Sequence, residues 1–527
     1  MVDRKREVEL INGTPVKRMF LSIINDYDLK TGLCELVDNA LDLWMSGDRR
    51  KSLVVSVELA PERQLISVED NAGGVKRQDL RLLIAPGESK NDLAAEVIGI
   101  FGVGGKRAGI ALAEHVTIKT RFHDEESSEL NITQEWLQTE DWNLAAYAIP
   151  DIAVGTTQVE MSRLRKSLTP EHVDELRRHF GETYKWFLVQ PCAVLVNGIP
   201  IVPVDFESWA FPPGYGPRLS RFNVDMGQGG RLSVEITAGL IRDRDPEGDN
   251  YGVYFYCNHR LIVKEERGRD VGYISGEAGV PHTDASLCRV IVRLQGPVQL
   301  MPWNSSKSGI NYSHPVFRQI RPRLIPLVSY YTSLSRRLRN EWEREVFRHE
   351  TGQVEEIPAA DVTGKHLVLP ALPRVNKPRS ERYRANNKIQ IQNKPWTLGL
   401  VESLAMVDVV ERQHFETKNR ISLILLDSNF EIALKEFIVN RQDLFPPKEF
   451  NDAEIRRLFA QRHLVTNAIL KRKPALKPLF ETANYYYGLR NKLIHERATV
   501  DVTESDIKNY RTTVERVLSS LFDLNFS

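Results

Sequence analysis

The sequence predicts a multidomain protein, with an α+β domain at residues 1–165, an α/β domain at 166–349 and an all-α bundle at 396–527. Three observations lead to this prediction. The chain has 527 residues, which is enough for about three domains. Helical and strand-like patterns are mixed in the N-terminal part without the regular βαβ alternation of a doubly wound fold. Only helical periodicity follows residue 396.

Composition limits the classes of protein to consider. Hydrophobic residues make up 42% and charged residues 27% of the chain, as in a globular protein with a large core. The formal net charge of +1 argues against a chain-wide field for nucleic acid. The four cysteines form no CxxC pair, so neither a zinc site nor a disulfide framework is indicated. The start of the chain is charged and no long apolar run follows, so we expect a cytoplasmic protein with no membrane partner.

The first domain mixes both kinds of element. Apolar residues recur at three- and four-residue steps in one segment, which predicts a helix, and shorter alternating runs predict strands. A glycine-rich loop continues into a second apolar helix. The expected helix is 23–45, the strands are 52–57, 64–69, 116–122 and 158–161, and the loop and second helix are 98–113.

The second domain begins with a helix and continues with short β-rich segments before a long helical stretch. The helices are expected at 170–187 and 315–348, and the strands at 193–196, 232–240, 252–257, 260–263 and 289–294. In the C-terminal bundle, the expected helices are 420–439, 454–470, 478–495 and 503–522. Helices of this length form a small bundle.

Residues 350–395 are predicted to form a basic linker. From Arg374 to Lys394 there are seven Lys or Arg residues and one acidic residue, Glu381. A solvated linker explains this composition, and a basic arm that contacts phosphates explains it as well.

A carboxylate and an amide lie one helical turn apart in the string Glu35-Leu-Val-Asp38-Asn39-Ala40. Glu35 and Asn39 therefore face the same way on the expected helix. A carboxylate can activate water, and Mg²⁺ prefers hard oxygen donors such as an amide oxygen. Hydrolysis of a phosphoanhydride requires little more than an aligned water and neutralised charge. An ordinary half-exposed helix face is the alternative for this string alone.

Two glycine-containing strings follow. Asp70 ends a strand-like run and precedes Asn71-Ala72-Gly73-Gly74, a tight turn at which the backbone can approach a planar ligand and a carboxylate can accept a hydrogen bond from an amine. Farther on, Gly99-Ile-Phe-Gly102-Val103-Gly104-Gly105-Lys106 precedes an apolar helix. Successive N–H groups in such a loop can form an anion-binding concavity. A plain turn and a flexible linker are the alternatives.

In this order and spacing, the three strings resemble the nucleotide-binding boxes of the GHKL ATPases, which share the Bergerat α+β sandwich and include gyrase, MutL, the ninety-kilodalton heat-shock chaperone, histidine kinases and MORC proteins. Gly155-Thr156-Thr157 resembles the last box. The resemblance implies that Glu35 is the general base and Asn39 the Mg²⁺ ligand, and that Asp70 reads adenine with support from Thr156. Ala72 stands where family members usually have glycine. The implied ATP-binding residues are Asp38, Asn39, Asp70, Gly74, Gly99, Gly102, Val103, Gly104, Gly105, Lys106 and Thr156.

The second domain resembles the transducer domain of MORC, MutL and gyrase-like proteins. Two segments show this resemblance: Tyr254-Phe-Tyr256-Cys-Asn258-His259-Arg260-Leu261-Ile262 and Leu300-Met-Pro302-Trp303-Asn304-Ser-Ser-Lys307-Ser-Gly309. By this resemblance Lys307 is the catalytic lysine that contacts the γ-phosphate. A lysine of a surface loop is the alternative.

The C-terminal bundle resembles HEPN domains, whose ribonuclease members carry an Arg-polar-x-x-x-His motif at a dimer cleft. The matching string is Arg490-Asn491-Lys-Leu-Ile-His495. Arg binds phosphate well and His titrates near neutrality, which suits metal-independent RNA cleavage. The resemblance thus implies that Arg490, Asn491 and His495 are catalytic, although many HEPN domains have no activity.

These expectations combine into one function. Mg-ATP binding would produce a homodimer and control a HEPN-like ribonuclease, as in bacterial anti-phage defence, with a partner protein encoded nearby. The alternative is a MORC-like ATP-dependent DNA clamp in which the helical domain only dimerises. RNA is the expected nucleic-acid partner in the first case and DNA in the second.

Overall fold

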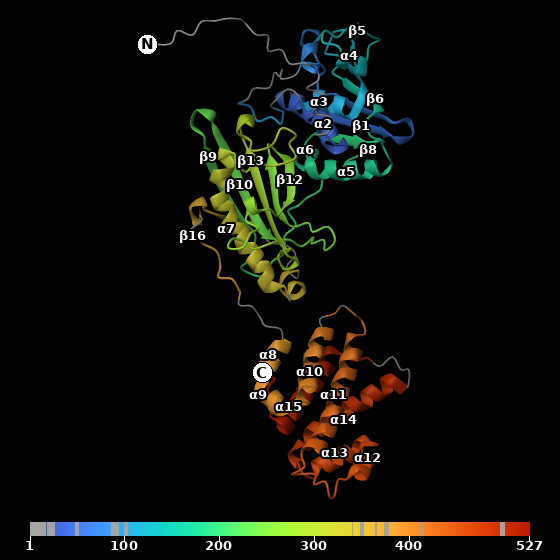
Figure 1. Cartoon of the computed structure of the whole chain (residues 1–527), viewed down its shortest axis with the longest axis vertical. Coiled ribbons are helices and arrows are strands. Elements are labelled where there is room, and N and C mark those ends of the chain that lie inside the picture. The colour runs from blue at the N-terminus through green and yellow to red at the C-terminus, as the bar shows by residue number, and fades with distance from the viewer. Residues whose placement is uncertain are drawn as a thin grey trace. The chain divides into compact units, whose positions relative to one another are not determined.

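The computed structural model describes residues 17, 27–47, 52–85, 94–99, 104–339, 341–347, 353–363, 366–373, 379–411, 413, 415–495 and 501–526. The chain forms two compact units, Met1–Arg374 and Val375–Ser527 (Figure 1). The first unit contains two large β-sheets, and the second is helical. A multidomain architecture with mixed α/β sheets and a C-terminal helical region is therefore confirmed.

The first sheet has eight strands in the order β5-β4-β3-β6-β2-β1-β7-β8. One layer of helices accompanies it: α3 (Gly104–Leu112) contacts α2 (Leu29–Ser46), and α2 contacts α5 (Glu171–Thr183). Short helices α4 (Gln134–Gln138) and α6 (Lys185–Leu188) lie between strands along the chain. The strands are β1 (Leu53–Ala60), β2 (Leu65–Asp70), β3 (Ala113–Thr120), β4 (Ser128–Thr133), β5 (Ala146–Ala148), β6 (Thr157–Leu164), β7 (Cys192–Val196) and β8 (Ile199–Pro200).

Local sequence explains the elements that carry the candidate site. Asp28 caps α2, because its side chain accepts a hydrogen bond from the Thr31 N–H at 2.7 Å. Apolar residues of α2 at helical spacing, such as Leu33, Val37 and Leu41, are completely buried. Strand β1 alternates buried and more exposed residues, which places its apolar face on the helical layer's core.

The first sheet extends beyond the expected domain boundary at residue 165. Strand β7, assigned from the sequence to the second domain, pairs in parallel with β1, with Val55 opposite Val194. Helices α5 and α6 form the crossover between β6 and β7. A parallel neighbour far along the chain leaves no local sequence signal, so the boundary at 165 and 166 divides this sheet.

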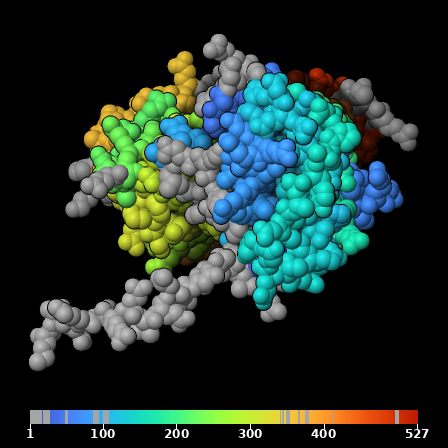
Figure 2. Space-filling model, turned by 90° about the horizontal axis from the view of Figure 1, so that it is seen from above, coloured from blue at the N-terminus to red at the C-terminus, as the bar shows by residue number. Residues whose placement is uncertain are grey.

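The second sheet has six strands in the order β12-β11-β13-β10-β9-β14. Helix α7 (Pro315–Leu338) packs on β10, β13 and β9. It ends before residue 348, the expected end, and a single π-helical turn, Trp342–Val346, follows. The strands are β9 (Arg218–Asp225), β10 (Arg231–Leu240), β11 (Gly252–Cys257), β12 (Arg260–Glu266), β13 (Cys288–Gln295) and β14 (Glu355–Ile357). In Figure 2, the surface of the first sheet's domain (blue to cyan) adjoins that of the second (green to yellow).

The described residues of the expected linker 350–395 are largely folded, which corrects that prediction. Strand β14 pairs with β9, and a short hairpin, β15 (Val362–Thr363) and β16 (His366–Leu367), follows. Helices α8 (Arg379–Asn386) and α9 (Lys388–Asn393) belong to the helical unit, where Tyr383 is in the core. Hydrogen bonds with distant segments stabilise these short polar elements, and composition does not reveal such partners.

The helical unit is built around α11 (Lys418–Asn440), which contacts α10 (Thr397–Glu411), α13 (Arg462–Leu470), α14 (Lys477–His495) and α15 (Glu504–Phe522). The expected helix 454–470 is two helices, α12 (Asp452–Phe459) and α13, with a break at residues 460–461. Within the part of the chain that the structure describes, no helix has the length and apolar character required to cross a membrane.

Candidate active site

Helix α2 places three polar residues of the first motif in different environments. Glu35 is 2% exposed and Asp38 is 1% exposed, so both carboxylates lie inside the protein. Asn39, the expected magnesium ligand, is on the exposed side of the helix. The helix therefore presents an amide at the surface next to two buried carboxylates.

Lys307 reaches these carboxylates from the second domain. Its Nζ atom lies 2.8 Å from Glu35 Oε2 and 2.9 Å from Asp38 Oδ2, and the residue is only 5% exposed. Its backbone has φ of 51°, the left-handed region that non-glycine residues seldom occupy. The structure thus brings together Glu35, Asp38 and Lys307, which lie far apart in the sequence.

Two further residues, Arg260 and Tyr184, complete this cluster. Arg260 Nε lies 3.0 Å from Asp38 Oδ1, and its Nη1 donates a hydrogen bond to the Lys307 carbonyl at 3.0 Å. The Tyr184 hydroxyl donates to Asp38 Oδ1 at 2.8 Å. Sequence reasoning missed both roles. The available signal for Arg260 was a charged residue at the start of the apolar run Leu261-Ile262-Val263.

The buried charges of the cluster compensate each other. Burial alone lowers the pKa of Lys307, but the carboxylates of Asp38 and Glu35 outweigh burial and raise it above its usual value. Burial also opposes ionisation of Asp38, whereas Arg260 and Lys307 hold its pKa below the usual value. Lys307 is therefore charged, and Asp38 is ionised, at neutral pH.

Asp42 is a second residue that the sequence analysis missed. Its carboxylate accepts hydrogen bonds from the backbone N–H groups of Ile98 and Gly99, both at 2.6 Å. Burial raises the pKa of Asp42 to about 7, against these two hydrogen bonds, which lower it. Asp42 is seven residues after Glu35, so periodicity along α2 could have indicated it. Through these two hydrogen bonds, Asp42 holds the backbone at the start of the glycine-rich segment against α2.

The second motif forms a close backbone junction. Gly73 N–H donates to the Gly155 carbonyl at 2.9 Å, so the turn after β2 meets the segment before β6. Gly74 has φ of 71°, and a Cβ there would lie 2.0 Å from the Arg121 carbonyl oxygen. Only glycine fits this position. Thr156 is buried at the same junction, 6% exposed, so Asp70, Gly74 and Thr156 lie in one region, as the motifs predict.

Asp70 has a perturbed carboxyl group. Burial raises its pKa to about 7, although a hydrogen bond from the Ala72 N–H to Oδ1 at 2.9 Å favours the ionised form. The neighbouring Glu69 carboxylate also disfavours a second negative charge. The group consequently titrates in the neutral range.

The glycine-rich lid is described only in part. Gly99 is held by Asp42, whereas Gly102 and Val103 lie outside the described residues. Gly104, Gly105 and Lys106 form the first turn of α3, of which only the backbone is described. Free N–H groups in the first turn of a helix are suitable donors for phosphate.

The comparison with known protein families now bears on this geometry. Residues 27–167 match the family model "Histidine kinase-, DNA gyrase B-, and HSP90-like ATPase". This match supports the GHKL superfamily for the segment. The matched segment contains Glu35, Asn39, Asp70 and Thr156, and it supports ATP binding and ATPase activity for the chain. No curated protein matches the chain.

The ATPase domain contains a buried oxygen suited to its reaction. Glu35 Oε2 contacts Lys307, whereas Glu35 Oε1 is buried and has no hydrogen-bond partner among the described residues. A buried carboxylate oxygen without a partner is costly unless it serves a ligand or a water molecule. Together with the exposed amide of Asn39, this oxygen fits a Mg-ATP site in which the protein supplies few metal ligands.

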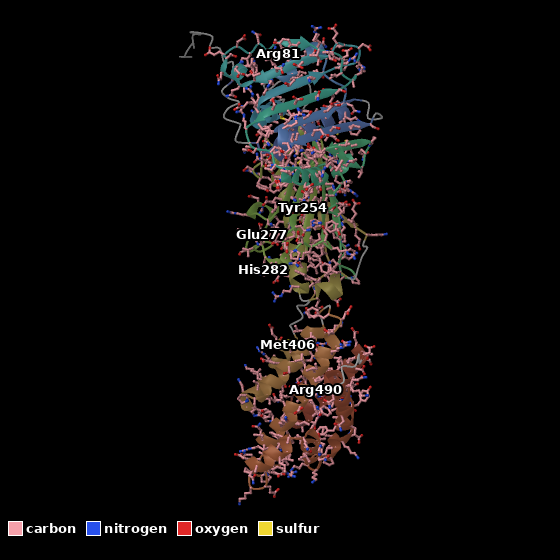
Figure 3. All side chains as sticks on the ribbon, turned by 90° about the vertical axis from the view of Figure 1, so that its right-hand side faces the viewer. Arg81, Tyr254, Glu277, His282, Met406 and Arg490 are labelled. Atoms are coloured by element: carbon pink, nitrogen blue, oxygen red, sulfur yellow. The ribbon has the colours of Figure 1, made fainter. Side chains whose placement is uncertain are left out.

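In the helical unit, where Figure 3 labels it, Arg490 lies near a buried carboxylate, that of Asp427. Its Nε lies 3.7 Å from Asp427 Oδ2, and its Nη1 donates to Asn491 Oδ1 at 3.0 Å. Asp427 also accepts hydrogen bonds from Arg462 Nη1 and the Tyr510 hydroxyl, both at 2.7 Å. His495 is exposed at the end of α14. Arg490 and Asn491 are thus in contact, and Asp427 is the residue that the sequence analysis did not anticipate.

Proposed function

We propose that this chain is an ATP-driven switch in which the ATPase domain reports its nucleotide state to the second, transducer-like domain through Lys307. The observation that carries the proposal is the contact of Lys307 Nζ with Glu35 and Asp38. One cation from the second domain neutralises the base of the first domain in a buried site. A change in its partner therefore changes both the chemistry and the contact between domains.

In the structure, Lys307 pairs with Glu35, the carboxylate that would activate water. The γ-phosphate of ATP offers this ammonium group a competing anion, and transfer of the ion pair frees Glu35 to act as general base. Mg²⁺ on Asn39 would neutralise phosphate charge. Arg260 keeps its contacts with Asp38 and with the Lys307 backbone, so only the side chain of Lys307 has to move. Loss of the γ-phosphate returns Lys307 to Glu35.

Turnover and binding of ATP by the full-length protein test this proposal. Glu35→Gln preserves shape, so it should retain ATP and lose hydrolysis by about two orders of magnitude or more. Lys307→Ala should impair hydrolysis and should leave ADP binding unchanged, because only the triphosphate requires the lysine. Lys264→Ala is the matched control, since Lys264 lies in the same domain and pairs with Glu182 at 2.9 Å, outside the cluster. Unaltered turnover in Glu35→Gln would refute the assignment.

We also propose that Mg-ATP closes two ATPase domains into a homodimer and that the helical unit is the effector, a HEPN-like ribonuclease. The supporting observation is the pair Arg490 and Asn491 on α14, followed by exposed His495. A guanidinium for phosphate and a titratable imidazole suffice for attack by a 2′-hydroxyl. A role in anti-phage defence, with a partner encoded nearby, rests on analogy between domain pairings.

Two measurements test the effector. Purified protein is incubated with labelled RNA and DNA, with and without ATP, and its mass is measured in the Glu35→Gln variant with ATP. RNA cleavage should disappear in His495→Ala while ATPase activity remains, and the Glu35 variant should accumulate as a dimer. His463→Ala, on α13, is the control for loss of a histidine in the same unit. If wild-type protein cleaves no RNA in either nucleotide state, the ribonuclease assignment is wrong.

The alternative is a MORC-like DNA clamp with a non-catalytic helical module. A free basic arm at 374–394 would support it, but Arg379 pairs with Asp408 at 2.6 Å and Arg384 pairs with Glu402. These pairs reduce the charge available for phosphates. A clamp predicts duplex-DNA binding that weakens steeply with salt and requires ATP. DNA binding of that kind without RNA cleavage would favour the clamp.

A further inference from the structure

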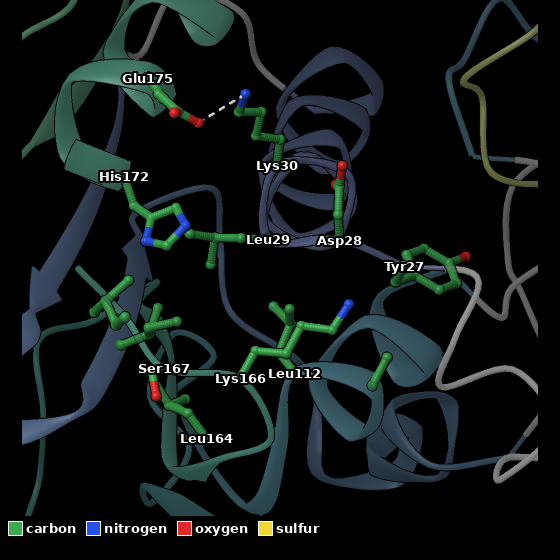
Figure 4. Close-up of a pocket in the computed structure, with 13 residues that line it drawn as sticks. Tyr27, Asp28, Leu29, Lys30, Leu112, Leu164, Lys166, Ser167, His172 and Glu175 are labelled. Atoms are coloured by element: carbon green, nitrogen blue, oxygen red, sulfur yellow. Dashed lines mark ion pairs between the residues drawn. The ribbon is translucent and has the colours of Figure 1, made fainter. Parts of the chain in front are cut away.

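A cavity of about 230 Å³ lies in the ATPase domain, and none of the residues assigned to the nucleotide lines it (Figure 4). Six of its thirteen lining residues are aliphatic, and they come from α2, β2, α3 and the end of β6, with Leu168 from the next segment. These apolar lining residues are Leu29, Ile66, Ala111, Leu112, Leu164 and Leu168. Such walls favour an apolar occupant.

The other lining residues carry two carboxylates, two ammonium groups, an imidazole and two hydroxyl groups: Asp28, Glu175, Lys30, Lys166, His172, Ser167 and Tyr27. Lys30 pairs with Glu175 at 2.9 Å, and the Asp28 carboxylate accepts hydrogen bonds from Thr31. Lys166 also lines the cavity and has no ion-pair or hydrogen-bond partner for its ammonium group among the described residues. A cavity with an aliphatic side and an ammonium group without a partner at its edge matches a molecule with an apolar body and one anionic end.

The cavity lies between the start of α2 and the end of α3, the two helices that carry residues of the ATP site. Leu29 and Lys30 are in the first turn of α2, which carries Glu35 and Asp38 farther along. Ala111 and Leu112 end α3, whose first turn is part of the glycine-rich lid. The helices are close here, because a Cβ on Gly32 would lie 2.8 Å from Leu112 Cδ1. An occupant that displaces Leu112 therefore displaces α3 relative to α2.

We propose that this cavity is a regulatory site for a small amphipathic anion, whose binding changes the affinity of the ATPase domain for ATP. A cavity of about 150 Å³ accommodates benzene. The larger volume here, about 230 Å³, suits a short alkyl chain or one aromatic ring with a few additional atoms. The carboxylate of such a molecule binds Lys166 while its apolar body contacts the aliphatic walls. Binding at this site does not depend on the proposed function, whereas its effect on ATP does.

Calorimetric titration of the full-length protein without nucleotide tests the site itself. Octanoate is the probe, octanol has the same chain without the charge, and acetate has the charge without the chain. Octanoate should bind, octanol should bind two- to fivefold more weakly, as expected for loss of one partly exposed ion pair, and acetate should give no heat. Equal binding of octanoate and octanol would overturn the anionic ligand class.

Variants test whether the octanoate measured by calorimetry binds in the cavity. Leu164→Trp places a bulky ring in the cavity and should abolish octanoate binding, whereas Leu164→Val should retain it. Lys166→Glu changes an exposed side chain, so it preserves the fold even if the tryptophan variant does not, and it should weaken octanoate at least fivefold. Arg63→Glu is its control, an exposed charge reversal in the same domain outside the cavity. Octanoate binding that survives both Leu164→Trp and Lys166→Glu would overturn the site.

The coupling is measured as the ATP dissociation constant with and without saturating octanoate. We expect a change of about fivefold or more, and ATP must change octanoate affinity by the same factor. Octanoate that binds without altering ATP affinity overturns the regulatory role and leaves the proposed ATPase intact. A chain that binds octanoate but no ATP contradicts the proposed function instead, so the two failures are distinguishable.

Discussion

Arg260 offers the sharpest test of how the two sheets of the first unit are connected. Arg260 and Lys307, both in the second domain, provide two positive charges to Glu35 and Asp38 of the ATPase domain. Arg260 is 3% exposed and Asp38 is 1% exposed. Replacing Arg260 with Met keeps the approximate length of the side chain and leaves one buried negative charge uncompensated.

The expected magnitude follows from this burial. Removing one partner of a buried ion pair destabilises a protein by about 3–5 kcal/mol, whereas replacing both partners is much less costly. Arg260→Met should therefore lower the free energy of unfolding by about 3–5 kcal/mol. The remaining hydrogen bond from Tyr184 and the ion pair with Lys307 place the value towards the lower end of that range.

The assay is urea unfolding followed by tryptophan fluorescence, because every tryptophan except Trp396 lies in residues 1–374. Arg260→Met, Asp38→Asn and the double variant form a cycle. The double variant should be more stable than the sum of the single effects predicts, by about 1–3 kcal/mol. Arg293→Met is the control, because Arg293 pairs with partly exposed Glu207 and Glu235. Additive effects in the cycle would refute the interpretation of the cluster as one charge-balanced unit.

Three further predictions concern other parts of the chain. Burial raises the pKa of Asp70 to about 7, and the ionised carboxylate accepts a hydrogen bond from adenine more strongly than the protonated group does. ATP affinity should therefore fall by up to about tenfold from about pH 8 to about pH 6, as the ionised fraction falls, and Asp70→Asn should flatten this profile. Gly74→Ala should lower the free energy of unfolding more than Gly198→Ala does. Gly198 has the same φ of 71° but nothing within 4 Å of the added Cβ, so its substitution should lower that free energy by only about 1–2 kcal/mol. Equal urea midpoints for the two variants would contradict the close approach at Gly74. Asp427→Asn should lower the thermal midpoint of the helical unit, measured by circular dichroism, because it leaves Arg462 buried without its ionic partner. An unchanged midpoint would show that the ion pair of Asp427 with Arg462 does not stabilise the helical unit.

Much of the secondary structure was predictable from the sequence. Helices α11, α14 and α15 and most strands of both sheets are within a few residues of their expected positions. Helix α2 ends one residue beyond the expected helix 23–45, but it begins at Leu29, after the Asp28 cap. Their apolar periodicity is local, and capping residues mark several ends, as Asp28 does for α2. The break between α12 and α13 was missed because Ala460 and Gln461 carry no strong helix-ending signal.

The candidate site was predictable to the extent that its residues lie in local motifs. Glu35, Asp70 and Gly74 belong to short strings whose order and spacing indicate nucleotide binding. Arg260 and Tyr184 lie outside these strings, and their role depends on contacts with Asp38 made only after folding. Long-range ion pairs leave no periodic trace in a sequence.

The sequence by itself indicated a GHKL-type ATPase domain, because its boxes are compact and each residue type has a distinct use. Tertiary structure decided how that chemistry is shared. It placed β7 beside β1, folded most of the expected linker, and put Lys307 and Arg260 on the carboxylates of α2. Burial excludes water from these charges and strengthens their attraction, and only the folded chain can bring residues so far apart in the sequence into such a site.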